Sequence, residues 1–149
     1  DGADAVDVHM ANCSLIPAEV IESNYQLRVE RYSLIAGSGG AGEFRGGLGI
    51  RADYRNIADE PLNFLSECEQ TTPSFAPQGL AGGSAGQPGS LVLIDTAGAE
   101  SPLPSKGRGV AQPGEIVSLR AGGGGGYGDP ADRSALAIDA DRSRGKILA

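Results

Sequence analysis

The stretch that decides the fold is AGGGGGYGDP, residues 121–130, in which five consecutive glycines precede Tyr127. Two further glycine-rich stretches lie at residues 37–49 (GSGGAGEFRGGLG) and 79–89 (GLAGGSAGQPG). Because glycine has no Cβ, extended segments of polyproline-II type can approach one another closely, as they do in collagen. We therefore expect these stretches to form packed extended segments, with flexible loops as the alternative.

The overall composition narrows the class of protein. Among the 149 residues are 24 Gly and 9 Pro, roughly twice the ordinary usage of these helix-hostile residues, which excludes a helical bundle or a coiled coil. The hydrophobic fraction of 40% argues against compositional disorder. Since the length corresponds to one ordinary domain, we predict a single domain over residues 1–149.

The charge balance excludes several kinds of partner. A net charge of −7 gives no general field to attract nucleic acid or an anionic membrane, and 5% aromatic residues with no Trp leave little surface for stacking bases. The sequence has no apolar run long enough to span a bilayer and no apolar secretory region. With only two cysteines, we expect a cytoplasmic protein and, since the sequence does not begin with Met, a processed or excised piece.

Short β-like runs lie between the glycine-rich stretches. The predicted strands are Gln26–Leu34, Leu48–Tyr54, Leu62–Leu65, Leu91–Ile94 and Ile116–Leu119. The last three are more continuously apolar, which is typical of buried strands. The pattern around Lys106 and Arg108 indicates a turn that leads to an edge strand.

Two short helices complete the predicted elements. One covers Ala18–Ser23 after Pro17, and the other covers Arg133–Arg144, with Asp132 as its cap. The second helix offers Leu136, Ile138 and Ala140 for burial. Together the elements predict a mainly β fold: a sheet or barrel-like domain with extended glycine-rich segments and one or two short helices.

Few residues are candidates for a site. His9, Cys13 and Cys68 could supply three ligands of a zinc site, but structural zinc normally takes four protein ligands. We favour two buried free thiols and a hydrogen-bonded histidine, and a metal site shared with another chain stays open. Glu19 and Glu22 lie one turn apart on the first helix and indicate a solvated face whose charges complement the helix dipole.

Two further patterns point to structure rather than chemistry. Gly37-x-Gly39-x-x-Gly42 follows a strand but does not lead into a helix, so a phosphate-binding loop is a weak interpretation. Arginines of the β region alternate with acidic residues, which is the spacing of ion pairs within a sheet. These residues are Arg28, Arg31, Arg45 and Arg51, with Glu30 and Asp53. We therefore predict no catalytic, cofactor-binding or metal-binding residue that functions on this chain alone.

The order of several segments along the chain resembles a known family. The segments are His9-Met10-Ala11-Asn12, Pro17-Ala18-Glu19 with Glu22, Leu27-Arg28-Val29 with Tyr32, Ser38-Gly39-Gly40-Ala41-Gly42, Arg45-Gly46-Gly47 with Gly49, Phe75-Ala76-Pro77-Gln78-Gly79-Leu80, Pro104-Ser105-Lys106, Pro113-Gly114, and Gly123-Gly124-Gly125-Gly126-Tyr127-Gly128-Asp129-Pro130. As a set they resemble the hydantoinase B/oxoprolinase family over essentially the whole chain. The match is to the C-terminal quarter or so of a typical member.

The resemblance implies a place in a larger enzyme. Members of this family are B-type partners of ATP-binding A-type subunits in 5-oxoprolinases, N-methylhydantoinases and acetone or acetophenone carboxylases. Their shared chemistry is the ATP-dependent phosphorylation of a carbonyl or amide oxygen, followed by hydrolysis or carboxylation. The resemblance therefore implies ATP and a divalent metal on partner subunits, and no cofactor on this chain.

The leading hypothesis is a small structural or assembly subunit of an ATP-dependent ketone carboxylase of the acetophenone or acetone type, which joins a ketone and bicarbonate into a β-keto acid. We expect a hetero-oligomer with a larger B-type subunit and A-type subunits. Alternatives are part of an ATP-dependent hydantoinase or 5-oxoprolinase, a stand-alone β-rich binding module, and a zinc-stabilised small domain. The expected interface residues are Tyr127, Phe44 and Phe75, which are lone aromatics in glycine-rich surroundings or next to them.

Overall fold

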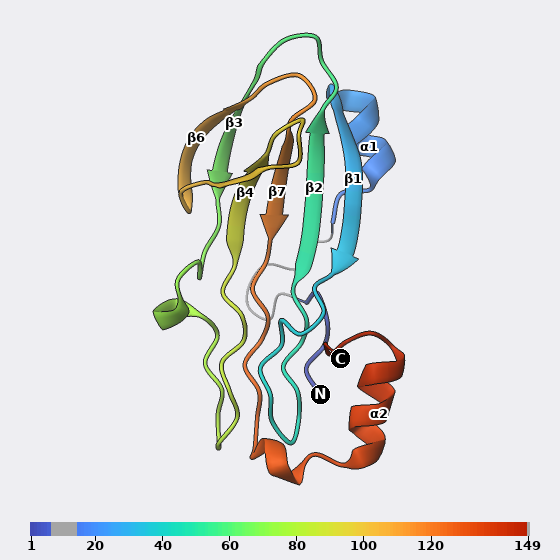
Figure 1. Cartoon of the computed structure of the whole chain (residues 1–149), viewed down its shortest axis with the longest axis vertical. Helices are drawn as coiled ribbons and strands as arrows, with labels where there is room; N and C mark the ends of the chain where they lie inside the picture. Colours follow the sequence, from blue (N-terminus) through green and yellow to red (C-terminus); the bar gives the residue numbers. More distant parts are fainter. Residues whose placement is uncertain (7–14, 149) are drawn as a thin grey trace.

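The computed structural model describes residues 1–6 and 15–148 and has a mainly β architecture (Figure 1). Its elements in chain order are α1 (Ala18–Asn24), β1 (Leu27–Leu34), β2 (Ile50–Asn56), β3 (Leu62–Glu67), the 3-10 turn η1 (Pro73–Phe75), β4 (Ser90–Ile94), β5 (Glu100–Pro102), β6 (Lys106–Ala111), β7 (Ile116–Arg120), the 3-10 turn η2 (Pro130–Asp132) and α2 (Ala135–Ser143). The predicted fold class is confirmed, although the strands form open sheets and do not close into a barrel.

Two antiparallel sheets make up one half of the molecule. The larger has the strand order β1-β2-β7-β4-β5, and β3 pairs with β6 in a separate two-stranded ribbon. Register places Ala52 of β2 opposite Leu119 of β7, which in turn lies opposite Leu91 of β4. Because side chains alternate across a strand, this register gathers apolar residues on the sheet face that the ribbon covers and charged residues on the other.

Two predictions from the sequence are wrong in the two-stranded ribbon of β3 and β6. Residues 106–108, predicted as a turn, belong to β6, where Gly109 lies opposite Phe64 of β3. A Cβ on Gly109 would lie 2.2 Å from Cζ of Phe64, so the glycine leaves room for the aromatic ring over the strand. The prediction that Leu62–Leu65 is continuously buried is wrong, because only one face of the ribbon is covered and Leu65 on the other face is 80% exposed.

The second helix also differs from its prediction. α2 begins after Ser134, whose side chain accepts a hydrogen bond from the backbone N–H of Ala137, and Asp132 ends η2 instead of capping the helix. Leu136 is 83% exposed, whereas the one buried residue of the helix is Asp141. The prediction of burial is therefore wrong for Leu136, whereas Ile138 and Ala140 are partly buried. The fully buried position belongs to a carboxylate that is partnered by arginines. No helix in residues 1–6 and 15–148 is long and apolar enough to cross a membrane.

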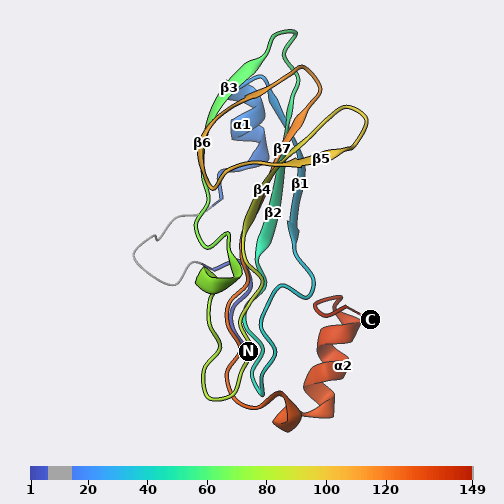
Figure 2. The same ribbon diagram turned by 60° about the vertical axis from the view of Figure 1, so that its left-hand side comes forward.

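The other half of the molecule is a bundle of extended glycine-rich segments, which run side by side below the sheets (Figures 1 and 2). We call residues 37–49, 77–89 and 121–128 the glycine bundle. The stretch 121–128 continues β7 and hydrogen-bonds to both of the others. The N–H of Gly124 donates to the carbonyl of Gly47 (2.9 Å), and the N–H of Gly126 donates to the carbonyl of Ser84 (2.9 Å). These bonds agree with packed segments and contradict flexible loops; the polyproline-II conformation stays a prediction.

Glycine is required in the bundle because backbones meet where side chains would stand. A Cβ on Gly123 would lie 2.0 Å from the carbonyl oxygen of Ser38, and one on Gly125 would lie 2.0 Å from that of Gln78. A Cβ on Gly46 would lie 2.0 Å from the carbonyl oxygen of Gly124. Contacts this short cannot be relieved by rotating a side chain, since the obstructing atom belongs to a hydrogen-bonded backbone. The segments therefore pack with no side chain between them.

Replacing Gly123 by Ala should lower the free energy of unfolding by about 3 kcal/mol or more, because the added methyl group must displace a backbone segment. The matched control is Gly107→Ala on β6, where the only atom that an added Cβ would approach is Cγ of Pro104 at 3.3 Å. We expect the control to change the free energy by less than about 1 kcal/mol. Denaturant titration of both variants measures the difference, and equal effects would contradict the close packing.

Candidate functional site

Of the three residues weighed as zinc ligands, the structure describes only Cys68. His9 and Cys13 lie outside the described residues. Cys68 is a buried free thiol, as predicted, and burial, with a smaller contribution from Glu69, raises its pKa. A protonated buried thiol is a poor nucleophile. Within residues 1–6 and 15–148, no group of three or more His, Cys, Asp or Glu side chains is arranged to hold a metal ion.

The Gly37-x-Gly39-x-x-Gly42 motif lies inside the glycine bundle and serves packing. The N–H of Gly37 donates to the carbonyl of Lys146 (2.9 Å), and the N–H of Gly40 donates to that of Gly124 (2.9 Å). A Cβ on Gly42 would lie 2.6 Å from the carbonyl oxygen of Tyr127. A phosphate-binding loop needs backbone N–H groups directed at the ligand, at the start of a helix. In this motif the N–H groups of Gly37 and Gly40 donate to backbone carbonyls of the protein itself. A β-bridge at Phe44, and not a helix, follows the motif.

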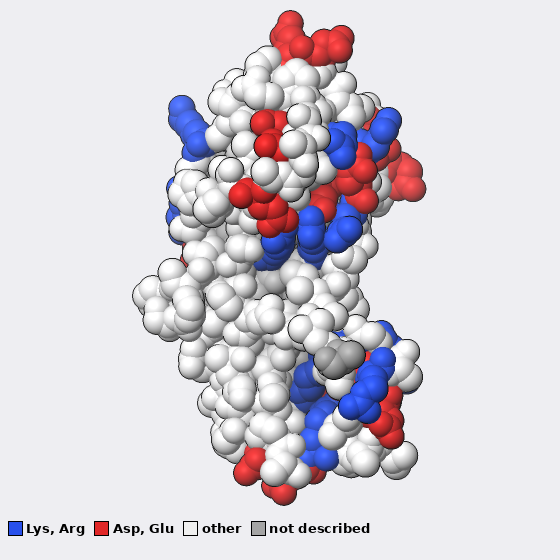
Figure 3. Space-filling view, viewed as in Figure 1, with Lys and Arg blue, Asp and Glu red and all other residues white. Residues whose placement is uncertain are grey.

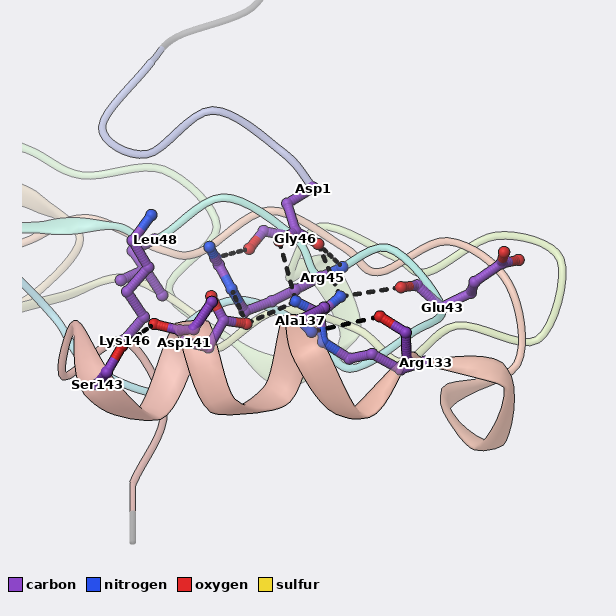
Figure 4. A network of polar contacts seen from close by, with 12 residues as sticks. Asp1, Glu43, Arg45, Gly46, Leu48, Arg133, Ala137, Asp141, Ser143 and Lys146 are labelled. Carbon is purple, nitrogen blue, oxygen red and sulfur yellow. Dashed lines mark hydrogen bonds and ion pairs between the residues drawn. The ribbon is translucent and has the colours of Figure 1, made fainter.

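A buried network of charged side chains joins α2 to the glycine bundle (Figure 4). At its centre, Nε of Arg45 donates to Asp141 on α2 (3.1 Å), and Nη1 donates to Asp4 (3.3 Å) and to the carbonyl of Gly46. Arg133 also donates to Asp141 (2.6 Å). Arg45 was predicted to form an ion pair within the sheet, and this prediction is wrong, because it lies in the bundle with its side chain only 4% exposed.

The same network fastens residues 1–5 to the bundle. Arg133 bonds both carboxylate oxygens of Asp1 (2.7 and 2.9 Å), and Nζ of Lys146 donates to Asp4 (2.6 Å). Two backbone hydrogen bonds also join this segment to the bundle. The N–H of Gly2 donates to the carbonyl of Arg45 (2.7 Å), and the N–H of Ala5 donates to that of Leu48 (2.8 Å). Three acidic and three basic side chains thus balance one another where residues 1–5, α2 and the glycine bundle meet.

The environment of Asp4 favours its charged form. Burial tends to raise the pKa of this carboxyl group, but the hydrogen bonds from Lys146 and the N–H of Leu48, together with the charge of Arg45, outweigh burial and hold the pKa below its ordinary value. Neither Asp4 nor Lys146 stood out in the sequence. These two residues bond each other from opposite ends of the chain, and no local spacing in the sequence reveals such a pair.

On the charged face of the large sheet, the predicted ion pairs of Arg31 and Arg51 are present, whereas Arg28 forms no ion pair with the described residues. Arg51 donates to both carboxylate oxygens of Asp53 (2.9 and 3.0 Å), Arg31 lies 3.9 Å from Asp53, and Arg55 pairs with Glu30 (2.7 Å). Burial tends to raise the pKa of Asp53, but its hydrogen bonds with Arg51 and Ser118 lower it overall. Acidic and basic side chains intermingle over this face of the strands (Figure 3). The face is therefore a structural ion-pair network.

An apolar groove of about 550 Å³ lies between the ribbon and the large sheet. Tyr54, Leu91 and Leu119 of the sheet and Phe64 of the ribbon line it. The buried Asn56 ties the ribbon to the sheet, since its Nδ2 donates to the carbonyl of Ala111 (2.9 Å). The hydroxyl groups of Tyr54 and Tyr32 lie 3.2 Å apart, and burial, with the bond to Tyr32, raises the pKa of Tyr54. The lining is mostly apolar, and Glu67 is its one charged residue among those described, so the groove suits contact with apolar side chains.

Exposed aromatic residues form the last candidate surface. Phe44 and Tyr127 are about half exposed and lie against each other at one end of the glycine bundle, with ring centroids 6.4 Å apart. Phe75 is exposed too, but it belongs to η1, halfway along the long axis in Figure 1. The structure thus brings together two of the three aromatic residues predicted for an interface.

Comparison with known proteins gives consistent matches. The family model described as Hydantoinase B/oxoprolinase matches residues 1–130. Caprolactamase subunit beta of Pseudomonas jessenii is 37% identical over 139 residues, which cover 87% of this chain and 22% of the relative. The crystal structure of the ATP-dependent caprolactamase of that species has a TM-score of 0.74 at 32% identity, covering 89% of this chain and 23% of the other.

Two further matches are to proteins named for other activities. A 5-oxoprolinase of Dictyostelium discoideum is 30% identical over 128 residues, or 86% of this chain and 10% of the relative. A nucleotide-free acetone carboxylase structure has a TM-score of 0.70 at 22% identity, over 91% of this chain and 22% of the other, which is a likeness of fold. The chain thus spans a quarter or less of the length of the relatives it matches.

Replacing Arg45 by Met should destabilise the protein by about 3 kcal/mol, because Asp141 and Asp4 lose a buried partner while Arg133 and Lys146 still compensate part of their charge. The control is Arg142→Met on α2, whose ion pair with Asp139 is mostly exposed. We expect it to cost less than about 1 kcal/mol. Urea titration compares the two variants, and a mild effect at Arg45 would show that the network does not hold α2.

Acid should weaken the attachment of residues 1–5. Because the folded protein lowers the pKa of Asp4 below the ordinary 3.8, its contribution to stability is present above about pH 4 and is lost as the pH falls through the folded pKa. The variant Asp4→Asn lacks this contribution. The difference in free energy of unfolding between wild type and variant should therefore shrink between about pH 5 and pH 2. A difference that stays constant over this pH range would contradict the attachment by Asp4.

Proposed function

The chain belongs to the hydantoinase B/oxoprolinase family, and from this premise we propose that it is a structural module of a B-type subunit in an ATP-dependent enzyme. In the enzyme, the module completes the B-type subunit and positions the larger part of it. The resemblance drawn from the sequence is thereby confirmed at the level of the family, whereas the role within it is our proposal.

The observation that carries the proposal is the open apolar groove. Tyr25 on its lining is 64% exposed, and Leu65 on the outer face of the ribbon is 80% exposed. The two-stranded ribbon that forms one wall of the groove would be marginal by itself. Exposed apolar surface of this kind marks a site of contact with another protein surface. Since the chain spans less than a quarter of the caprolactamase beta subunit, the remaining part of a B-type subunit is the natural occupant.

The relatives favour a cyclic amide as the substrate of the whole enzyme. Those at 30% identity or more include proteins named as a caprolactamase subunit and a 5-oxoprolinase. The acetone carboxylase match, at 22% identity, supports only a common fold. A ketone carboxylase, which is the leading hypothesis from the sequence alone, is therefore the second candidate. In either case we place ATP and a divalent metal on the partner subunits.

The test is the native mass of the untagged protein from its source, with identification of the polypeptides that migrate with it. We expect a large complex that contains an ATP-binding polypeptide. Its ATP hydrolysis should rise with a cyclic amide such as caprolactam or 5-oxoproline, and a rise with a ketone plus bicarbonate would support the second candidate instead. A free 15.1 kDa monomer with a sharp two-state unfolding transition would contradict the proposal and favour a stand-alone binding module.

A further inference from the structure

Three large side chains meet at the end of the glycine bundle farthest from the sheets. Tyr127 forms an antiparallel bridge with Phe44 and a parallel bridge with Leu80. All three are exposed, at 55%, 48% and 66% respectively. We call these three residues the aromatic tip.

The backbone holds the aromatic tip in a fixed arrangement. Phe44 and Tyr127 exchange two backbone hydrogen bonds of 2.9 Å, and the N–H of Gly128 donates to the carbonyl of Leu80 (3.0 Å). The rings of Phe44 and Tyr127 also lie against each other, with centroids 6.4 Å apart. A rigid group of exposed apolar side chains loses little conformational entropy on binding, which is the property of an interface hot spot.

Acidic residues surround the aromatic tip. Glu43 precedes Phe44, Asp129 follows Tyr127 by two residues, and both are exposed. Glu43 also lies close to the backbone after Tyr127, since an added Cβ on Gly128 would lie 2.9 Å from Cβ of Glu43. Asp132 follows in η2. Figure 3 shows acidic atoms at this end of the molecule, and Figure 4 shows Glu43 directed away from the buried network. Among the described residues, none of the three forms an ion pair.

Arg133, which contacts the backbone of Glu43, does not neutralise this acidic rim. Arg133 donates to Asp1, to Asp141 and to the backbone carbonyl of Glu43, and its side chain is only 10% exposed. Two copies of the chain meeting tip to tip would bring their acidic rims together, which disfavours self-association. A partner with basic side chains would instead be attracted to the rim.

We propose that the aromatic tip binds an apolar pocket flanked by Lys or Arg side chains on a larger polypeptide of the same enzyme complex. This inference rests on the proposed function, since it names the chemistry of one contact within that complex. The apolar side chains supply most of the affinity, whereas the acidic rim directs association and makes it sensitive to salt.

The experiment titrates the larger polypeptide that co-purifies with the wild-type chain against purified variants of the chain. We expect Phe44→Ala and Tyr127→Ala each to raise Kd by about tenfold or more. Glu43→Lys should also raise Kd and should reduce the dependence of the association rate on salt between 0.05 and 0.5 M.

Matched controls separate the tip from general effects. Ile57→Ala removes an apolar side chain of similar exposure (46%) in the loop after β2, and Glu19→Lys reverses a charge on α1. Both should bind the larger polypeptide as the wild type does. Circular dichroism melts of every variant must match the wild type, so that a loss of binding reports the contact and not the fold.

The outcomes distinguish this inference from the proposed function. If no larger polypeptide co-purifies with the wild type, the proposed function fails and the inference fails with it. If one does, but the tip variants and Glu43→Lys bind it as tightly as the wild type, only the inference is overturned. Dimerisation of the wild type that Tyr127→Ala abolishes would also overturn it, because the tip would then bind a second copy.

Discussion

Close approach of glycine backbones is the constraint on which this structure depends. Residues 122–126 lie between two other glycine-rich segments, and carbonyl oxygens of those segments occupy the positions where side chains would stand. The central segment continues directly from β7, whose register with β2 and β4 places the two faces of the large sheet. The same segment ends at Tyr127, so it also fixes the aromatic tip. One run of glycines therefore positions both ends of the molecule.

The glycine bundle has too few apolar side chains to form a hydrophobic core of its own, and two other kinds of interaction stabilise it. Backbone hydrogen bonds join the segments internally. At the surface of the bundle, the buried ion pairs of Arg45 and Arg133 hold α2 and residues 1–5 in place. A buried charge is costly unless it is fully paired, so the network fixes one arrangement of these segments rather than adding much stability. The glycine bundle thus obtains specificity from charges where an ordinary domain obtains it from core packing.

Much of the fold was predictable because its signals are local. Alternating apolar residues locate β1 and β2, and Pro17 marks the start of α1. The sequence predicted a turn around Lys106 and Arg108 before an edge strand, whereas β6 already begins at Lys106. The glycines of this segment resemble a turn, and its partner β3 lies some forty residues away along the chain. Arg45 was misplaced for a related reason: its partners, Asp4 and Asp141, lie near opposite ends of the chain. Of the candidate sites, only exposed aromatic residues in glycine-rich surroundings carried a local signal.

The two ends of the molecule differ in how they can meet a partner. At the glycine bundle, every segment is locked by its neighbours, so the aromatic tip presents one shape before contact. At the sheets, the ribbon is held mainly by pairing between β3 and β6 and by Asn56, and its outer face leaves Leu65 exposed. A wall of this kind gains stability when apolar side chains fill the groove beside it. The chain therefore combines a pre-formed contact with one that a partner completes, which is what a module that joins larger polypeptides requires.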